Sequence, residues 1–299
     1  MSKEYDVIVL TDRRYVNPAQ PGAYEKNILL EDQLVTDALK KRGLKVKRLS
    51  WDDPAFDWSS AASVLFRTTW DYFDRFDEFS KWLDRISTET TLFNSEKLIR
   101  WNQDKHYLND LSTKGTHTPA TLFLKKGTQG DLSAHIKNTG WYDAILKPCV
   151  SGSARHTYRV TPENVQSYEK VFSELISQES MMLQPFQKNI VEQGEMSLMI
   201  FNGEYTHAVL KKAKKGDFRV QDDFGGTVAL YKASQKEIAF ALTAVTHCPE
   251  PPMYARVDIF TDNEGRLAVS ELELIEPELW FRLHPEAAHK MAAAIYTAL

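Results

Sequence analysis

Cysteine is nearly absent from this sequence, which has only Cys149 and Cys248 among 299 residues. The two lie far apart and show no metal-ligand spacing, so we expect reduced thiols in a reducing compartment rather than a disulfide framework. No apolar run approaches the roughly 20 residues that span a bilayer. The charged N-terminus leads into a short apolar run without a small-residue cleavage site, which predicts a strand and not a signal peptide. A cytoplasmic protein is therefore expected.

Excess positive charge is also missing. The formal net charge is -4, and the longest basic cluster, Lys211 to Lys215, is short and isolated. Nucleic acids and anionic membranes select clustered positive charge. We therefore expect neither as a partner, and a small-molecule substrate instead. A homodimer is left open.

Several motifs of common enzyme classes are absent. Neither G-x-x-x-x-G-K-[ST] nor G-x-G-x-x-G occurs, which leaves a P-loop and a dinucleotide fold without support. The histidines are scattered without ligand spacing, so no histidine metal site is predicted. Ser151 and Ser153 have no paired histidine and aspartate, and a hydrolase triad is unsupported.

What is present is an ordinary globular composition, 42% apolar and 26% charged, in a chain long enough for two or three packed units. The first ninety or so residues alternate apolar strand patterns with helical periodicity, which predicts an open α/β domain. The predicted strands are Asp6–Leu10, Leu44–Leu49 and Ser63–Phe66, and the predicted helices are Glu25–Lys41 and Phe76–Ile86.

The rest of the chain predicts two further units of mixed α/β (α+β) character. The middle one begins with a long linking helix and continues with short strands and a helix, at Asn94–Gly115, Thr121–Leu124, Ala144–Pro148, Thr157–Val160 and Thr161–Ser177. The last one contains two hairpins, the first around the strong turn signal Asn202-Gly203. Its hairpin strands and helices are expected at Met196–Phe201, Tyr205–Lys211, Tyr254–Thr261, Leu267–Leu274, Gln235–Thr246 and Glu286–Thr297. We expect divisions at 1–94, 95–180 and 181–299.

The second hairpin carries three carboxylates. Glu271 and Glu273 alternate along one strand and point the same way, and Asp258 on the neighbouring strand can join them. Like charges at that distance raise one another's pKa unless cations neutralise them, and Mg²⁺ favours carboxylate and phosphate oxygens. A solvated outer face is the alternative. The apolar residues between the acids favour the metal site. Glu276 and Glu278 extend the acidic stretch, either near the metal or facing the substrate.

Lysines and small residues supply a second signal. Lys147 ends a predicted strand and is followed by Ser151, Gly152, Ser153 and Ala154, a loop whose backbone N–H groups can hold phosphates. A surface turn is the alternative. Lys105 alone is simply a lysine on a predicted helix.

Together these elements resemble the ATP-grasp superfamily in its glutathione-synthetase-like branch. The matching elements occur in the expected order, at Asn102–Lys105, Leu146–Pro148 with its Ser/Gly loop, Leu183–Phe186, Gly194-Glu195, Phe201–Gly203, Gly216–Gln221, Gly225-Gly226, Arg256–Asp258 and Glu271–Glu273. The segments Arg67–Tyr72 and Glu276–Phe281 resemble the O-ureido-serine cyclo-ligase-like group.

The resemblance implies ATP and Mg²⁺, with two ions expected and Mn²⁺ able to substitute. It implies a role for each matching position. Lys105 and Lys147 would contact phosphates beneath the loop of Ser151, Gly152 and Ser153. Gln184, Pro185 and Phe186 would form the hinge beside adenine, and Glu192 would bind the ribose. Asp258, Glu271 and Glu273 would hold the ions. The catalytic cations would be Lys211, Arg219 and Arg256, the last at the developing oxyanion.

Two positions depart from the family pattern. Glu273 stands where many relatives have asparagine, which adds a negative charge, and Gln221 also stands where asparagine is common. Neither change abolishes metal binding, but both weaken any transfer of substrate identity.

The implied function is an ATP-dependent ligase that activates a carboxylate as an acylphosphate for attack by an amine, on a small amino acid, peptide or related metabolite. Arg67, Trp70 and Asp71 follow the third strand, where open α/β sheets place ligands, and Arg67 suits a carboxylate. A packed aromatic corner is the other interpretation of Trp70. A small-molecule kinase on the same scaffold and a non-catalytic nucleotide-binding protein are the alternative functions.

Overall fold

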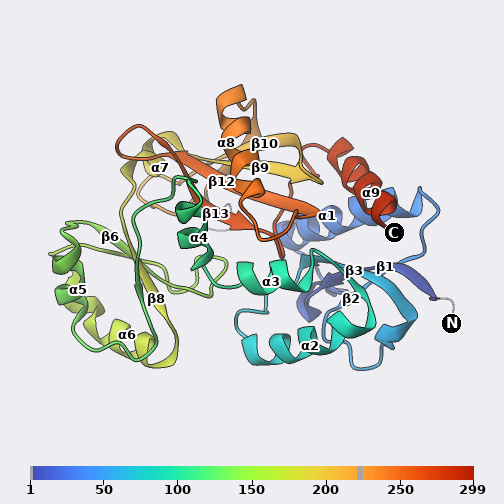
Figure 1. Ribbon diagram of the computed structural model, residues 1–299, viewed down its shortest axis with the longest axis horizontal. Coiled ribbons are helices and arrows are strands. Elements are labelled where there is room, and N and C mark those ends of the chain that lie inside the picture. Colours follow the sequence, from blue (N-terminus) through green and yellow to red (C-terminus); the bar gives the residue numbers. More distant parts are fainter. Residues whose placement is uncertain (1–2, 221–224) are drawn as a thin grey trace.

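A computed structural model describes residues 3–220 and 225–299, so Gln221 lies outside the described residues. Within these ranges the chain forms three sheets, and the predicted mixed α/β class is confirmed (Figure 1). No helix in the described part of the chain is long and apolar enough to cross a membrane.

The N-terminal sheet is parallel, in the order β2 (Val46–Ser50), β1 (Tyr5–Thr11), β3 (Ala61–Thr68), β4 (Thr91–Phe93). Alternate residues of β1 enter different cores. Val7 and Val9 pack in the cluster that contains residues of α1 (Ala23–Lys40), whereas Ile8 and Leu10 pack in the cluster of α2 (Phe76–Glu89). A sheet buried on both faces explains the continuous apolar run. Two short 3-10 turns, η1 (Arg13–Tyr15) and η2 (Trp58–Ser60), complete this part.

The middle sheet is antiparallel, in the order β5 (Leu122–Leu124), β8 (Met181–Pro185), β6 (Ala144–Pro148), β7 (Tyr158–Val160). Helices α5 (Leu132–Thr139) and α6 (Val165–Gln178) share a core with one face of it. In Figure 1 these elements form the lobe at the left. Leu146 points into that core, so its neighbours Ile145 and Lys147 face the other way, toward the cavity described below.

The third sheet is antiparallel and runs β11 (Thr227–Tyr231), β10 (Glu204–Lys212), β9 (Glu195–Phe201), β12 (Tyr254–Thr261), β13 (Leu267–Glu273). Both predicted hairpins are confirmed. Asn202 and Gly203 take positive φ angles of 48° and 79°, as a tight two-residue turn requires. One face packs with α8 (Gln235–Thr246), and the other packs with α9 (Glu286–Ala298), which lies beside α1 (Figure 1). The short helix α7 (Lys188–Gln193) precedes β9.

The expected long helix over Asn94–Gly115 is wrong. The structure has two short helices, α3 (Glu96–Asn102) and α4 (Tyr107–Thr113), with a turn between them that carries Lys105. The backbone N–H of Lys105 donates to Cys149 O at 2.9 Å, and the Asp104 side chain accepts from the N–H of His106 at 2.9 Å. These bonds compete with helical ones and end the helix.

The helix expected from Thr161 begins later. Its first residue is Val165. The side chain of Asn164 accepts a hydrogen bond from the N–H of Thr161 at 2.8 Å, and the N–H of Asn164 donates to Thr161 O at 3.1 Å. A separate turn therefore occupies the residues before the helix.

Buried polar contacts join the N-terminal sheet to the third sheet. The Asn94 amide donates to Tyr254 O at 2.9 Å and to Leu274 O at 2.8 Å. Glu31 on α1 accepts from the N–H groups of Phe281 and Arg282, each at 3.0 Å. The end of β4 and the helix α1 are thereby held against the third sheet and the segment that follows it. The division at 1–94, 95–180 and 181–299 stays a prediction, and Met181–Pro185, assigned there to the last unit, pairs within the middle sheet.

A buried histidine gives this fold an acid-sensitive point. His207 on β10 lies 2.9 Å from Leu279 O and stacks at 4.9 Å on His284. Burial lowers the pKa of His207 from 6.5 to about 4. The nearby His284 and Lys290 also lower this pKa, by smaller amounts, whereas the hydrogen bond to Leu279 O raises it. The unfolded chain therefore takes up a proton as the pH falls through 6.5, whereas the folded chain resists it until about pH 4.

We expect this histidine to cost about 3 kcal/mol of folding free energy between pH 7.5 and pH 4.5, at about 1.4 kcal/mol per pKa unit. His207→Gln removes that part of the acid sensitivity, so its urea-unfolding midpoint will fall less on acidification than that of the wild type. His289→Gln, on α9, is the control and will behave as the wild type. An equal fall in all three proteins would contradict the assignment.

Candidate active site

The three sheets meet around an open cavity of about 280 Å³. Side chains of β6, β10, β12 and β13 line it, together with the loop after β6, the segment after β8 and the segment after β3. Most of the predicted site residues lie in this lining, namely Trp70, Lys105, Lys147, Ser151, Gly152, Ser153, Gln184, Pro185, Phe186, Lys211, Arg219, Arg256, Asp258, Glu271 and Glu273. Sequence positions up to about two hundred residues apart therefore share one surface.

The acidic trio, defined as Asp258, Glu271 and Glu273, is gathered at one side of this cavity. One carboxylate oxygen of each lies within 4.8 Å of the others. Asp258 pairs directly with Glu271 across the two strands. Asp258 is 1% exposed and all three line the cavity, so these acids do not form a solvated outer face.

Cations neutralise each member of the trio. Asp258 accepts from Lys211 Nζ at 2.8 Å and from Arg256 through two bonds of 2.9 Å. Arg256 also contacts Glu273 closely, and Lys105 Nζ lies 2.8 Å from Glu271. A metal ion bound among the three carboxylates would neutralise them instead, and would release the basic side chains for other partners.

Burial and mutual repulsion separate the pKa values of these carboxyl groups. Burial raises the pKa of Glu273 to about 8. The neighbouring carboxylates act in the same direction, whereas the charge of Arg256 lowers this pKa. Burial likewise raises the pKa of Glu276 to about 7. At Asp258 burial acts in the same direction, but Arg256 and Lys211 outweigh it and hold the pKa well below its usual range. The pKa of Glu271 is also lowered, because the charges of Lys105 and Lys147 outweigh the effect of burial.

The donor set fits magnesium. Three carboxylates within reach of one another offer the hard oxygen ligands that magnesium prefers. A divalent ion bound among them would supply positive charge at this buried acidic site.

The segments that are expected to bind phosphate lie beside the acidic trio. Lys105 Nζ donates to Ser151 O at 2.7 Å, which joins the loop after β6 to Glu271 through one ammonium group. Burial lowers the pKa of Lys147. The nearby Lys105 also lowers it, whereas Glu271 raises it. A Cβ on Gly152 would come within 2.6 Å of the Phe73 ring, so only glycine allows the loop to sit this close to the N-terminal part.

The predicted adenine hinge also reaches the cavity. The Gln184 side chain donates to Thr121 Oγ1 at 2.9 Å. The Phe186 ring lies 3.8 Å from the Arg159 guanidinium and 6.2 Å from the Phe218 ring. Glu192, expected at the ribose, is exposed on α7 and is not part of the cavity lining, whereas Ile190 of the same helix is.

The three predicted substrate residues do not all share one space, although Arg67 and Trp70 both line a small adjoining crevice. Trp70 lines the cavity and donates to Glu276 O at 2.8 Å. Asp71 is held inside the N-terminal part by Trp51 Nε1 at 2.7 Å and Arg75 at 2.8 Å, and does not line the cavity. Arg67 is 1% exposed and lies in an adjoining crevice of about 10 Å³.

Glu195 and Trp280 are lining residues beside the predicted catalytic cations that received no role from the sequence. Glu195 Oε2 lies 2.7 Å from Lys211 Nζ. The Trp280 ring lies 5.1 Å from the Arg256 guanidinium and 5.9 Å from Lys211 Nζ. The hairpin of β9 and β10 could have indicated the role of Glu195, because Glu195 pairs with Lys211 across it. A bulge between Tyr205 and His207 sets that register, and without it Glu195 would lie opposite Leu210.

Known proteins share this arrangement. Residues 108–277 match the sequence model of the RimK-like ATP-grasp domain, and residues 7–94 match that of the D-cycloserine synthetase DcsG N-terminal domain. The cycloserine biosynthesis protein DcsG of Streptomyces lavendulae is 28% identical over 275 residues, which cover 87% of this chain and 90% of that protein. These matches confirm both the ATP-grasp resemblance and the narrower one to the O-ureido-serine cyclo-ligase-like group.

Solved structures share the fold over nearly the whole chain. The crystal structure of D-cycloserine synthetase DcsG has a TM-score of 0.86 at 24% identity and covers 98% of this chain and 99% of that one. D-alanine–D-alanine ligase from Bacillus anthracis has a TM-score of 0.67 at 14% identity, with 98% and 96% covered. The ATP-grasp match spans more than half of the sequence. The chain therefore belongs to the RimK-like ATP-grasp family of ATP-dependent ligases.

Proposed function

We propose that this enzyme uses Mg²⁺ and ATP to convert a substrate carboxylate into an acylphosphate, which an amine then attacks. The observation that carries the proposal is the meeting of the acidic trio with Lys105, Lys211 and Arg256 in one cavity, where Lys105 contacts Glu271 and both Lys211 and Arg256 contact Asp258 at 2.8–2.9 Å. Cations and acids in that arrangement suit the transfer of a phosphoryl group, whose catalysis depends on positioning and charge stabilisation.

The trio would hold one or two Mg²⁺ ions, or Mn²⁺ in their place, and these ions would supply charge neutralisation for the β- and γ-phosphates. Lys105 would exchange Glu271 for phosphate oxygens, and Lys147 would bind phosphate beside it. The loop of Ser151, Gly152 and Ser153 would cover the phosphates, and Gln184, Pro185 and Phe186 would bind adenine. Glu192 would reach the ribose only if α7 moved, because the side chain is exposed outside the cavity.

In the first chemical step a carboxylate oxygen bonds to the γ-phosphorus and the bond to the ADP oxygen breaks. In the second, the amine nitrogen bonds to the acyl carbon and phosphate leaves with the electron pair of the broken C–O bond, while the amine proton passes to solvent or phosphate. Arg256, Lys211 and Arg219 would stabilise the charge that develops on oxygen in these steps. Loop closure would keep water from the acylphosphate.

Positional isotope exchange tests the acylphosphate directly. ATP labelled at the β,γ-bridging oxygen is incubated with Mg²⁺ and candidate amino acids or dipeptides without a competent amine. Scrambling of the label that requires the carboxylate substrate supports reversible acylphosphate formation, and hydroxylamine should then yield a hydroxamate. Accumulation of a stable phosphorylated product without any need for an amine would instead identify a kinase. Tight Mg-ATP binding without turnover across the panel would identify a non-catalytic nucleotide-binding protein.

Substrates with a carboxylate are further supported by Arg67. Its Nε and Nη1 are buried and have no hydrogen-bond partner among the described residues, and Asp32 Oδ1 is 4.0 Å away. The crevice around it shares Trp70 and Glu278 with the main cavity. A substrate carboxylate that widened this crevice would satisfy both guanidinium nitrogens. Trp70 would form the wall between the two spaces, and Asp71 would fix the segment that carries it.

We expect Arg67→Lys to raise the KM of the carboxylate substrate at least about tenfold, because a lysine cannot make the two parallel bonds of a guanidinium. The KM for ATP should change less than about twofold. Arg85→Lys, on the exposed face of α2, is the control. An equal rise in both KM values, or none, would remove Arg67 from the substrate site.

A further inference from the structure

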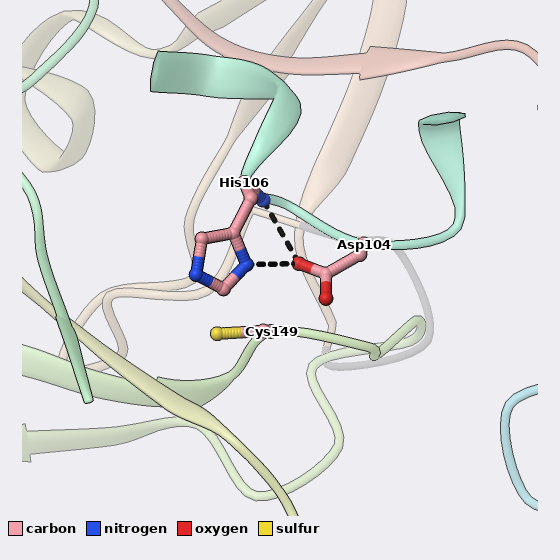
Figure 2. A group of neighbouring side chains, drawn as sticks. All are labelled: Asp104, His106 and Cys149. Atoms are coloured by element: carbon pink, nitrogen blue, oxygen red, sulfur yellow. Dashed lines mark hydrogen bonds and ion pairs between the residues drawn. The ribbon is translucent and has the colours of Figure 1, made fainter. Parts of the chain in front are cut away.

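A cluster of three different metal-binding side chains lies behind the cavity. Asp104 and His106 flank Lys105 in the turn between α3 and α4, and Cys149 directly follows β6 (Figure 2). One ligand atom from each lies within 4.8 Å of the others. None of the three belongs to the cavity lining, so this cluster is separate from the acidic trio.

The cluster is held in place before any ion binds. The Asp104 carboxylate accepts from the His106 backbone N–H at 2.9 Å and lies 2.5 Å from His106 Nδ1. The His106 ring stacks on Phe123 with centroids 4.1 Å apart and planes tilted by 21°. The bond from Lys105 N–H to Cys149 O fixes the turn against the end of β6. Preformed ligands lose little freedom on binding an ion.

The donor atoms select a particular class of ion. Sulfur, imidazole nitrogen and carboxylate oxygen together suit a borderline cation such as Zn²⁺, and three protein ligands leave a fourth tetrahedral position for water or another ligand. Mg²⁺ prefers an all-oxygen environment and would favour the acidic trio. The chain thus has two candidate cation sites that differ in ligand chemistry.

Cys149 is poorly placed for a redox role. Its side chain is 1% exposed, and it is a free cysteine, as is Cys248. Burial shields its thiol from oxidants and alkylating reagents. Half-exposed Asp104 and His106 give an ion its path to the buried sulfur.

We propose that Asp104, His106 and Cys149 bind one thiophilic divalent cation of the Zn²⁺ type. A metal–sulfur bond forms on binding, and the thiol proton passes to solvent. Binding of the ion does not depend on the proposed ligase function, whereas its coupling to Mg-ATP rests on the proposed nucleotide site.

Occupation of this site affects the nucleotide-binding lysines. Lys105 lies between two of the ligands, and Lys147 precedes the third by two residues. An ion would fix the turn in the arrangement in which Lys105 Nζ bonds to Ser151 O and Glu271. Lys105 would then be less able to turn to phosphate, so the ion should weaken Mg-ATP binding. By linkage, Mg-ATP should weaken binding of the ion by the same factor.

Titration with Co²⁺ in excess Mg²⁺ tests the site, because only a thiolate ligand gives a sulfur-to-cobalt charge-transfer band. We expect the band to saturate at one Co²⁺ per chain and to be displaced by Zn²⁺. Cys149→Ser should abolish it, and Cys248→Ser, at the other buried cysteine, should retain it. His106→Asn should weaken Co²⁺ binding by at least about tenfold.

Absence of the band in the wild type, or its survival in Cys149→Ser, would overturn the proposal. Circular dichroism establishes whether Cys149→Ser is folded. If it is not, the more exposed His106→Asn carries the test, and unchanged Co²⁺ affinity there overturns the site. Zn²⁺ should lower Mg-ATP affinity at least about fivefold in the wild type and in Cys248→Ser but not in His106→Asn. Equal Mg-ATP affinity with and without Zn²⁺ would overturn the coupling.

Discussion

Replacement of Asp258 by asparagine, or of Glu271 by glutamine, will reduce ATP turnover at least about a hundredfold while the fold is retained. Each change removes one of the proposed anionic metal ligands and leaves the shape of the side chain almost unchanged. In the proposed mechanism the remaining carboxylates would bind a divalent ion more weakly, and the phosphates would lose charge stabilisation where transfer needs it. Phosphate release measured across a range of Mg²⁺ concentrations detects both effects.

The matched control is Glu264→Gln, the same change in the turn of the same hairpin, where the side chain is 71% exposed. It should keep wild-type turnover. Near-normal turnover in Asp258→Asn or Glu271→Gln, with circular dichroism like that of the wild type, would refute the metal assignment. Equal loss in Glu264→Gln would show that any change in this hairpin disturbs the site.

Lys211→Met will destabilise the metal-free protein by about 3 kcal/mol. The buried ammonium group lies 2.7 Å from Glu195 and 2.8 Å from Asp258, and methionine fills its volume without its charge. Removal of one partner from a buried ion pair leaves an uncompensated charge, which typically costs about 3–5 kcal/mol. Arg256 still neutralises Asp258, so the lower end of that range applies.

Mg²⁺ should recover part of this loss, because it supplies the missing positive charge next to Asp258. Thermal unfolding with and without Mg²⁺ measures the effect, and the stabilisation by Mg²⁺ should be larger in Lys211→Met than in the wild type. Lys212→Met, at the exposed neighbouring position, is the control and should match the wild type. A Lys211→Met variant as stable as that control would show that the cation does not hold the acids in place.

Most secondary-structure elements follow from local patterns. Apolar runs and helical periodicity located β1, β2, β3, α1 and α2 to within a few residues, and Asn202-Gly203 located the first hairpin. The short strand β4 was not predicted. The prediction of one long helix over Asn94–Gly115 was wrong because the interruption of this helix depends on a contact with Cys149, more than forty residues away. Periodicity reports on a helix's neighbours in sequence and carries no information about such a contact.

The acidic trio shows where local reasoning ends. Alternation predicted correctly that Glu271 and Glu273 share a face. Whether Asp258 joins them depends on register, and a bulge between Asp258 and Ile259 shifts the pairing by one residue. In the unshifted register Asp258 would lie opposite Ser270 and would point away from both glutamates. Ser270 Oγ instead donates to Asp258 O at 3.1 Å, within the bulge.

The sequence by itself determined the kinds of chemistry available to this protein: the acids on one strand, the lysines at element ends, the small-residue loop, and the family to which their order belongs. The tertiary structure decided which of them meet. It brought Asp258 to the trio and Glu195 to Lys211 through two bulges, buried Arg67 in a crevice, and left Glu192 outside the cavity. The physical reason is that strand register and buried contacts depend on the packing of distant segments, whereas alternation and periodicity depend only on the local backbone.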